Sequence, residues 1–388
     1  MKKNILVVLN CLFLLQWLSA QEIKRIDTHL HLYDTNRPGS FDFLNDHKAD
    51  GSDKLRFPHL AQQFREKANP AGVQFGYVVE ASTRREDNFW LAQICDTSKC
   101  LVGFSANLNP LADTFIKDLD SLSKSPKFRG IRPRVGGINL SDPTTISRLG
   151  ELEKRGLVLE LWGNSSAIIA IARVYPKMNI IVNHFAGGSI RESGVPNEDS
   201  YKSKLAALAA RPNIYIKISS LYTLSGQNPA PTNMAFYKPL IDAAVGAFGP
   251  DRVIFGSDWS LSDLRGNYQD MVKLLDEYCN SRSDLSIKQL FYTNAINAYG
   301  LKSFTTSALS MPVKQTQLIY PNPSSRKITV ESQKPSGVEI FTLDGKEVFK
   351  CNMLKFNHEI QVDNFKAGVY LVKSINSEKI ETQKLIIN

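Results

Sequence analysis

Two histidines separated by one residue lie in an apolar segment near the start of the chain, residues 25–32, which reads RIDTHLHL. Side chains alternate between the two faces of a strand, so Asp27, His29 and His31 would share one face. Burying imidazoles among apolar groups costs free energy unless they have polar partners. The pattern therefore indicates a polar site that can exchange protons or bind a metal, with a satisfied pair of core histidines as the alternative. Asp27 would brace this site from beneath the histidine pair.

Two further polar residues end apolar segments of the kind that form buried strands. His184 lies at the end of the segment 179–185, and Asp258 ends the segment 252–258. Taken alone, His184 fits a core or helix-capping histidine, and Asp258 fits the N-cap of a following helix. Because the carboxyl ends of barrel strands meet at one rim, both residues and the histidine pair would converge there. The coincidence of three strand ends favours a site over separate structural roles.

The elements that position these residues alternate regularly between residues 21 and 303. Short apolar segments rich in Val, Ile, Leu or Phe alternate with polar stretches that suit helices. The predicted strands are 25–32, 74–81, 101–108, 128–133, 156–162, 179–185, 213–219 and 252–258, and the predicted helices include 58–69, 84–96, 110–123, 147–155 and 201–210. Eight strand–helix repeats over about 280 residues predict a (β/α)8 TIM barrel of the α/β class. A doubly wound open sheet is the alternative, but no GxGxxG motif follows the first strand.

Composition and charge exclude several classes of protein. The 388 residues are 43% hydrophobic and 22% charged, as in ordinary globular proteins. The formal net charge of +9 is dispersed, without a long run of like charges, so we expect no nucleic-acid partner. The single apolar run near membrane length is N-terminal, which excludes a multi-span membrane protein. Residues 1–20 have a basic start, an apolar middle and a small residue, Ala20, at the end, which is typical of a secretory signal peptide.

The cysteines carry no metal-binding pattern. The chain has five, of which Cys11 lies in the signal peptide, and none of the spacings is CxxC. Cys95 and Cys100 are close enough in sequence to form a disulfide in an oxidising compartment. Two small buried thiols are the alternative, and the spacing leaves both open.

The character of the sequence changes after residue 303. Residues 304–318 are rich in Ser and Thr and indicate a linker. Residues 319–388 contain short strand-like segments and turn signals such as Asp344-Gly345, which predict a small all-β, sandwich-like domain. Its candidate strands are 328–331, 338–341, 359–362 and 369–373. We assign no chemistry to this domain, because it has one histidine and no acidic cluster.

Residues 23–300 resemble the amidohydrolase superfamily, in its amidohydrolase-related branch. The motifs that carry the resemblance are Asp27-Thr-His29-Leu-His31, Asn183-His184 and Phe255-Gly-Ser-Asp258-Trp259. Within that branch the chain most resembles lactonases that act on sugar lactones and on 2-pyrone-4,6-dicarboxylate, with support from the segments 128–132 and 216–219. The resemblance implies a hydrolase that opens a lactone or related cyclic ester of a small-molecule substrate.

The chain departs from the superfamily in one respect that bears on metal. Metal-dependent members usually add a His, or a bridging Lys or Glu, from the fourth and fifth strands, whereas the fifth strand here offers Glu160 and no His. His29, His31, His184 and Asp258 can still form a tetrahedral zinc site. The resemblance to lactonases implies that the same residues work without metal, and we favour a mechanism that requires no cofactor. One zinc or similar divalent ion is the alternative.

The residue types suggest a mechanism for either case. Without metal, Asp258 is the general base for the attacking water, and His29, His31 and His184 donate hydrogen bonds to the oxyanion. With zinc, the metal would polarise the carbonyl and acidify water, and Asp258 would be ligand and proton acceptor. The rival functions are a zinc-dependent amidohydrolase or decarboxylase of a small carboxylic acid, and a non-catalytic surface-binding protein. Retention of all four rim groups argues against the last.

Four residues near predicted strand ends are candidates for substrate binding. Arg132 and Lys217 would hold a carboxylate or hydroxyl group, or else brace loops. Trp162 and Trp259 would stack on a sugar ring, or else pack the mouth of the barrel. Glu160 is a second acid or base, or a partner for a Lys or Arg.

The C-terminal domain, residues 319–388, resembles the type A sorting domain of type IX secretion. The motifs are Tyr320-Pro-Asn-Pro323, Phe341-Thr-Leu-Asp-Gly-Lys346 and Ala367-Gly-Val-Tyr-Leu-Val372. The resemblance implies the type IX secretion machinery as a partner, and export across the inner and outer membranes to the cell surface or medium. A carbohydrate-binding β-sandwich is the alternative, weakened by the short length and the lack of an aromatic platform. The oligomeric state is left open.

Overall fold

The computed structural model describes residues 23–37, 44, 52–133, 138, 142–301, 317–320, 322–375 and 380–388. The chain divides into two compact units, residues 1–303 and 304–388. The expected signal peptide, residues 1–20, lies outside the described residues, as does most of the expected linker, 304–318. The last two residues of that linker range are described and begin strand β9. Within the described part of the chain, no helix has both the length and the apolarity to span a membrane.

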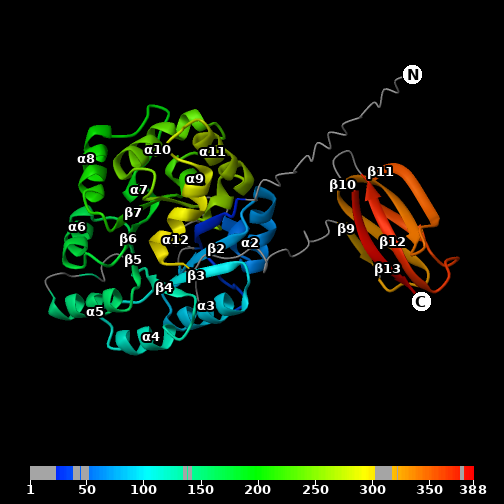
Figure 1. Ribbon diagram of the computed structural model, residues 1–388, viewed down its shortest axis with the longest axis horizontal. Coiled ribbons are helices and arrows are strands. Elements are labelled where there is room, and N and C mark those ends of the chain that lie inside the picture. Colours follow the sequence, from blue (N-terminus) through cyan, green and yellow to red (C-terminus); the bar gives the residue numbers. More distant parts are fainter. Residues whose placement is uncertain are drawn as a thin grey trace, which may run out of the picture. The chain divides into compact units, whose positions relative to one another are not determined.

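Eight parallel strands form the centre of the first unit and pair in sequence order from β1 to β8 (Figure 1). Their bounds are β1 (Ile26–Leu30), β2 (Phe75–Val79), β3 (Leu101–Ala106), β4 (Phe128–Ile131), β5 (Val158–Leu161), β6 (Ile180–Val182), β7 (Ile214–Ser219) and β8 (Val253–Gly256). Each lies within a segment predicted as a strand, since continuous apolar runs suit strands that are buried on both faces. The predicted (β/α)8 barrel is confirmed.

The barrel closes between its first and last strands through backbone hydrogen bonds. The N–H of His31 donates to the carbonyl of Trp259 at 2.7 Å, and the N–H of Asp258 donates to the carbonyl of His29 at 2.8 Å. A parallel bridge also joins Leu30 to Trp259. Residues that were predicted to do chemistry therefore also complete the barrel.

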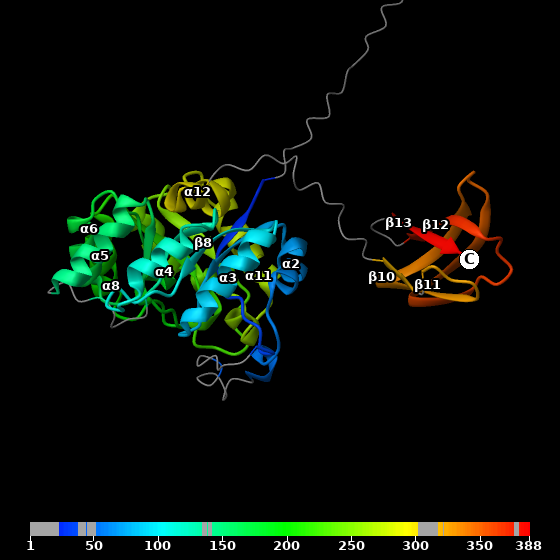
Figure 2. The ribbon, with the colours of Figure 1, turned by 90° about the horizontal axis from the view of Figure 1, so that it is seen from below.

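Helices connect the strands and form a ring outside them (Figures 1 and 2). The main ones are α2 (Ala61–Ala68), α3 (Arg85–Thr97), α4 (Phe115–Leu122), α5 (Pro143–Lys154), α6 (Ser165–Val174), α8 (Glu198–Ala209), α10 (Met234–Phe248), α11 (Tyr268–Asn280) and α12 (Asn294–Tyr299). Shorter turns are η2 (Ser52–Leu55), η3 (Asn69–Ala71), α7 (His184–Gly187), α9 (Leu221–Leu224), η4 (Leu261–Leu264) and η5 (Gln289–Thr293). Helix α5 begins after Asp142, whose carboxylate accepts the backbone N–H of Thr145 at 2.6 Å. The apolar core of this unit lies mainly between the strands and the helices.

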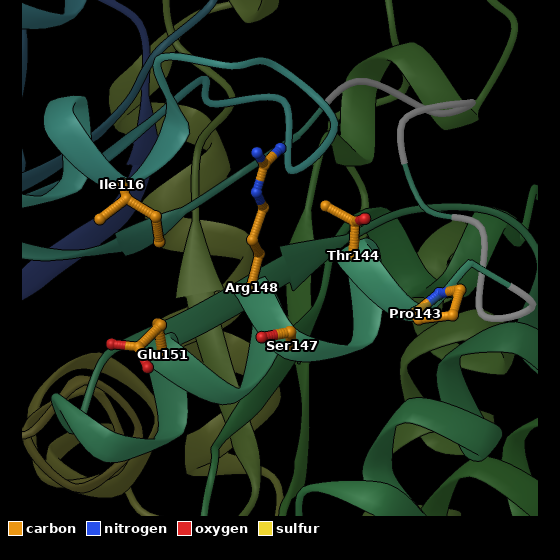
Figure 3. A pocket seen from close by; sticks show the side chains of 6 residues that line it. All are labelled: Ile116, Pro143, Thr144, Ser147, Arg148 and Glu151. Atoms are coloured by element: carbon orange, nitrogen blue, oxygen red, sulfur yellow. The ribbon is translucent and has the colours of Figure 1, made fainter.

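The outer helical layer carries a groove between α4 and α5 (Figure 3). It is lined by Ile116, Pro143, Thr144, Ser147, Arg148 and Glu151. One guanidinium nitrogen of Arg148 has a structural use, because it donates to the carbonyls of Pro110 and Ala112 at 2.6 and 2.9 Å. This lining includes none of the residues predicted for the site, so the groove takes no part in the chemistry discussed below.

The second unit consists of antiparallel strands, as predicted. They are β9 (Gln317–Tyr320), β10 (Lys327–Thr342), β11 (Glu347–Gln361), β12 (Gly368–Ile375) and β13 (Ile380–Ile387). The sheet order is β11-β10-β12-β13, with β9 also paired to β10. The first part of β10 pairs with β9 and the last part with β12, so one bent strand contributes to two pairings. An apolar core that includes Ile328, Ile340 and Val372 holds the unit together.

Two predictions for the C-terminal strands were wrong in detail. The segments 328–331 and 338–341 belong to the single strand β10, and β9, β13 and most of β11 were not predicted. Residues 332–337 lie between those two segments and were not predicted as strand. In the structure the pairing of β10 with β11 shifts register there instead, which accommodates the extra residues as an irregularity within one strand.

The cysteines in the barrel are free thiols. Cys95, Cys100 and Cys279 are all buried, and none of them is in a disulfide. Of the two alternatives for Cys95 and Cys100, the structure therefore has the buried thiols.

Candidate active site

Four of the predicted residues converge at the carboxyl ends of the barrel strands. Nε2 of His31 lies 3.3 Å from Oδ1 of Asp258, and Nε2 of His29 lies 3.7 Å from the same oxygen. The ring centroid of His29 lies 4.5 Å from that of His184 and 5.1 Å from that of His31. All four side chains belong to buried residues. The structure thus brings together three imidazoles and one carboxylate from β1 and from the ends of β6 and β8.

An unusual backbone conformation marks the strand ends that carry these groups. His184, Ser220 and Asp258 directly follow or closely follow β6, β7 and β8, and their φ angles are 51°, 63° and 62°. Residues with a Cβ adopt this left-handed region at a cost in conformational free energy, and such residues cluster at functional sites. Each strand therefore turns sharply at the rim.

A glycine allows the first and last strands to approach each other at the site. A Cβ added to Gly256, the last residue of β8, would lie 2.5 Å from Cβ of His29. Two carbon atoms that are not bonded to each other do not approach so closely. Any residue larger than glycine at this position would therefore push the ring of His29 away. The glycine in the Phe255-Gly-Ser-Asp258 motif therefore has a packing role.

Asp258 is held as a carboxylate with one free oxygen. Its Oδ2 accepts the hydroxyl of Ser220 at 2.6 Å, whereas its buried Oδ1 has no hydrogen-bond partner. Burial by itself raises the pKa of Asp258, but the imidazoles of His184 and His31 and the Ser220 hydroxyl lower it, to about 2. The group is thus ionised at neutral pH, and Oδ1 is available to a molecule that enters the site.

The ring partners of His31 and His184 constrain their protons. Nδ1 of His31 lies 2.7 Å from the carbonyl of Val79, so it must donate, and Nε2 faces Asp258. Nδ1 of His184 lies 2.9 Å from Oγ of Ser219, which also accepts the backbone N–H of His184. Burial lowers the pKa of His184 to about 4, against the attraction of Asp258. His184 is therefore neutral at pH 7.

Lys217 lies beneath the rim and not at the mouth of the barrel. Its side chain is fully buried, with Nζ 2.6 Å from Oε2 of Glu160 and 3.2 Å from Nδ1 of His29. Burial lowers the pKa of Lys217, to about 8, and Glu160 opposes that shift. The structure thus shows Lys217 in contact with Glu160 and His29, in place of the predicted contact with substrate. Glu160 has the second of its two predicted roles, as the partner of a lysine.

Asp27 braces the strand that carries the histidine pair. Its Oδ1 accepts the backbone N–H groups of His29 at 3.0 Å and of Ser257 at 2.9 Å, and its Oδ2 accepts the hydroxyl of Tyr268 at 3.0 Å. Burial raises the pKa of Asp27 to about 6 in spite of these donors. The carboxyl group ties β1 to the end of β8, which fixes the spacing of His29 and Asp258.

The other predicted substrate residues divide into two groups. Trp162, after β5, is 47% exposed, and its ring lies 6.1 Å from that of His184. Arg132, after β4, is half-buried, and its charge contributes to lowering the pKa of His184. Trp259 is 1% exposed and packs against the rings of His59 and Phe64, so its predicted stacking on a sugar is corrected to core packing. The turn at Asp258 directs the next side chain into the core.

Sequence reasoning missed two serines of the site. Ser219 supports the ring of His184, and Ser220 holds Oδ2 of Asp258. Both lie where the segment 213–219 ends, and polar residues at the end of an apolar strand were the signal that identified His184 and Asp258. The same rule applied to the seventh strand would have found them.

The donor set is suited to a single divalent metal ion. One ligand atom from each of His29, His184 and Asp258 lies within 4.8 Å of the others. Nε2 of His29 and Oδ1 of Asp258 are buried without a hydrogen-bond partner. Imidazole nitrogen and carboxylate oxygen are common zinc ligands, and His31 offers a fourth. These residues fit such an ion by type and by spacing.

A (β/α)8 barrel with two histidines on its first strand, a histidine after its sixth and an aspartate after its eighth defines a barrel hydrolase. Residues 26–301 match the family described as Amidohydrolase, and the chain belongs to this family. Residues 318–388 match the family described as Secretion system C-terminal sorting domain. The chain is thus an amidohydrolase-family hydrolase that carries a secretion sorting domain.

Named relatives are similar to the barrel. An L-fucono-1,5-lactonase from Burkholderia ambifaria is 28% identical over 207 residues, which covers 52% of this chain and 69% of that protein. An amidohydrolase structure from Burkholderia multivorans with bound zinc is 19% identical, with a TM-score of 0.63 over 72% of this chain and 100% of its own. A structure from Pseudomonas putida assigned as a 2-pyrone-4,6-dicarboxylic acid hydrolase is 18% identical, with a TM-score of 0.56 over 72% and 98%. These two structures support the fold.

Proposed function

We propose that the barrel hydrolyses a lactone, or a related cyclic ester, with Asp258 as the general base. The observation that carries this proposal is Oδ1 of Asp258, a buried oxygen without a hydrogen-bond partner that lies 3.3 Å from Nε2 of His31 and 3.7 Å from Nε2 of His29, with His184 in the same cluster. An ionised carboxylate with an open lone pair accepts a proton from water, and neighbouring N–H groups stabilise the negative charge that develops on a carbonyl oxygen. Both functions are needed to open an ester, and both groups lie at one rim.

The proposed reaction uses the residues in two steps. First, Asp258 takes a proton from water while the resulting hydroxide attacks the carbonyl carbon, and the oxyanion accepts hydrogen bonds from Nε2 of His29 and His184. Second, the tetrahedral intermediate collapses, the bond to the ring oxygen breaks, and the proton returns from Asp258 to that oxygen. The product is a hydroxy acid, and Asp258 is again a carboxylate.

A metal-dependent hydrolase or decarboxylase is the second candidate, and the convergence of the ligand atoms favours it. His29, His184 and Asp258, with His31, would hold the ion. When bound, zinc supplies a Lewis acid that polarises a carbonyl group and acidifies water. Asp258 would then be both a ligand and the proton acceptor. Arg132 would orient a substrate carboxylate. We favour the metal-free reaction because an ammonium group, that of Lys217, lies against the ring of His29.

The substrate class that we propose is a sugar lactone. The name of the Burkholderia ambifaria relative supports this choice. The exposed ring of Trp162 lies beside His184, where it can stack on the apolar face of a sugar ring. Arg132 can donate to the hydroxyl groups or to the new carboxylate of the product. A non-catalytic surface-binding role would not require the free oxygen of Asp258.

We also propose that the enzyme acts outside the inner membrane. The C-terminal sorting domain and the expected signal peptide, residues 1–20, together support export by the type IX secretion machinery. The small-molecule substrate would then be one that is present at the cell surface or in the medium. Detection of the barrel in the medium or on the surface of intact producing cells, and its loss when residues 319–388 are deleted, would test this.

The activity can be tested with the full-length chain after metal is removed with a chelator. Proton release is followed on a panel of sugar lactones, which includes L-fucono-1,5-lactone, with and without added zinc. We expect hydrolysis by the stripped protein and none by Asp258→Asn. Hydrolysis only with zinc would replace the metal-free mechanism with the metal-dependent one. A wild-type protein inactive on every lactone in both conditions would refute the proposed function.

A further inference from the structure

The lumen beneath the rim contains a buried ion pair that the proposed reaction does not use. Nζ of Lys217 lies 2.6 Å from Oε2 of Glu160, and neither side chain is exposed. Buried ion pairs contribute little net stability compared with apolar residues of similar size. The same ammonium lies 3.2 Å from Nδ1 of His29. The position of this ammonium against the ring of His29 indicates that it helps to decide which nitrogen of that ring carries the proton.

The surroundings of Glu160 hold its carboxyl group against the lysine. Oε1 of Glu160 accepts the hydroxyls of Ser105 at 2.7 Å and of Tyr299 at 3.2 Å, while Oε2 accepts from Lys217. Both oxygens of Glu160 therefore have donors, and Oε2 is the one that contacts Lys217. Nζ of Lys217 also lies 5.9 and 5.5 Å from the ring centroids of Tyr77 and Tyr299, where the negative face of a ring attracts a cation.

An ammonium group has donors and no acceptor, so Nδ1 of His29 must accept its N–H. A neutral imidazole that accepts at Nδ1 carries its proton at Nε2. We propose that Lys217, held by Glu160, is a positioning residue that fixes His29 in the tautomer with its proton on Nε2. That Nε2 is buried, has no hydrogen-bond partner and lies 3.7 Å from Oδ1 of Asp258. The N–H at Nε2 of His29 can therefore donate a hydrogen bond to an oxygen atom of a molecule that enters the site.

The fixed tautomer has two consequences. The N–H of His29 stabilises the carbonyl oxygen of a bound lactone, and this consequence rests on the proposed function. A metal ion would need the lone pair at Nε2, so the ammonium of Lys217 opposes ligation by His29, and this consequence is independent of any substrate. Lys217 therefore favours hydrogen-bond donation by Nε2 of His29 and opposes the binding of a metal ion at this nitrogen.

The two histidines of the pair differ in this respect. Nδ1 of His31 donates to the carbonyl of Val79, so the neutral ring of His31 has its proton on Nδ1. Nδ1 of His29 accepts from Lys217 instead. Nδ1 is thus a donor in His31 and an acceptor in His29, and a spectrum that resolves both rings contains its own reference.

Nitrogen NMR of the wild-type protein tests the tautomer without any change to the lumen. The full-length, metal-free chain is labelled with ¹⁵N at its histidine rings, and the signals of His29 are those lost in His29→Gln. We expect a protonated Nε2 and a non-protonated Nδ1 for His29, and a protonated Nδ1 for His31. A protonated Nδ1 at His29 would overturn the proposal.

Zinc affinity tests the consequence for metal. The double variant Lys217→Met/Glu160→Gln removes both charges, so no buried charge is left alone and the net charge of the lumen is unchanged. With His29 free to change tautomer, we expect zinc affinity to rise at least about tenfold in competition with a chromophoric chelator. On an accepted lactone, kcat should fall about 10²-fold while KM changes little, as for loss of an oxyanion donor. Unchanged zinc affinity in the folded double variant would contradict the proposal.

Lys127→Met is the matched control. Lys127 is a partly buried lysine just before β4, and its Nζ donates to the carbonyls of Cys95 and Ser98, both at 2.6 Å. Its loss should leave zinc affinity, the His29 signals and kcat unchanged. If the double variant does not fold, the NMR result for the wild-type chain decides whether the proposed tautomer of His29 is correct. If no lactone is hydrolysed, the proposed function fails while the tautomer and the zinc affinity still test this inference.

Discussion

The two units of the chain each contain a buried histidine on a strand, and the contacts of the two rings differ. In the C-terminal unit, Nε2 of His358 lies 2.6 Å from the carbonyl of Ser336. In the barrel, Nε2 of His29 is equally buried but has no hydrogen-bond partner, and a carboxylate oxygen of Asp258 lies 3.7 Å away. Burial is common to both rings. The comparison teaches that an open ring nitrogen beside a charge, and not burial, distinguishes a histidine with chemistry from one that supports a fold.

The largest effect is expected where the charge beside the open nitrogen is removed. Asp258→Asn keeps the size of the side chain and its contact with Ser220 but removes the proton acceptor. We expect kcat/KM for lactone hydrolysis to fall about 10³-fold or more, with the thermal midpoint near that of the wild type. Full activity in this variant would refute the mechanism.

Replacing the two histidines in parallel tests the comparison directly. His29→Gln should lower kcat about 10²-fold through loss of an oriented donor, with little change in stability. His358→Leu removes the partner of a buried carbonyl, so the free energy of unfolding of the C-terminal unit should fall by about 1–3 kcal/mol, with activity unchanged.

Kinetics and urea denaturation of both variants measure the two effects separately. Loss of activity in His358→Leu, or loss of stability alone in His29→Gln, would break the distinction between the two rings.

The spacing of β1 and β8 at the site gives a further test. Gly256→Ala places a Cβ 2.5 Å from that of His29 and must displace the ring or the strand. We expect a loss of about 2 kcal/mol in stability and at least about a tenfold loss in kcat. Gly246→Ala is the control, because it lies in α10 with no atom within 4 Å of the added Cβ, and a helical glycine gains stability on this change. Equal effects in the two variants would argue against the close approach at Gly256.

The smallest effect on activity is expected for an open oxygen at the end of another strand, β2. Glu80 follows β2, with Oε1 accepting the N–H of Ser82 at 2.7 Å and a buried Oε2 without a partner. Burial raises the pKa of Glu80, as does the charge of Asp87, from 4.5 to about 7. The native state then binds more protons than the unfolded state between these values, so stability falls as pH rises through that window.

Glu80→Gln should remove this dependence on pH. Between pH 5 and pH 8 the wild type should lose about 2 kcal/mol more stability than the variant in urea denaturation. Activity should be unchanged at either pH, since the hydrogen bond of Glu80 goes to the backbone of Ser82 and not to His29, His184 or Asp258. An identical pH slope in both proteins would show that Glu80 does not hold its proton in the native state.

Much of the barrel could be predicted from the sequence because its strands are buried on both faces. Continuous runs such as 179–185 and 252–258 have few other structural explanations, and every predicted strand of the barrel contains an observed one. The rim residues followed from one rule, since a polar residue at the end of an apolar run must have a polar environment. His184 and Asp258 were found in this way.

The errors arose where the direction or depth of a side chain decides its role. Trp259 follows a residue in the left-handed conformation, which directs the ring into the core, and no sequence pattern reveals that turn. Lys217 precedes the end of β7 by two residues, which places it one layer deeper in the lumen than the rim. In β10, residues 332–337 continue the strand because of its pairing with β11, and the local sequence does not contain that information.

The hydrogen bonds that close the barrel connect residues more than 220 positions apart in the chain, and they belong to the site itself. His29, His31, Asp258 and Trp259 join β1 to β8 through their backbones. The proposed catalytic rim is therefore assembled only when the last strand docks onto the first. A chain in which β8 is missing or has not docked can contain β1 to β7 and still lack the arrangement of His29, His31 and Asp258. Enzymatic turnover would therefore report that the whole barrel has closed.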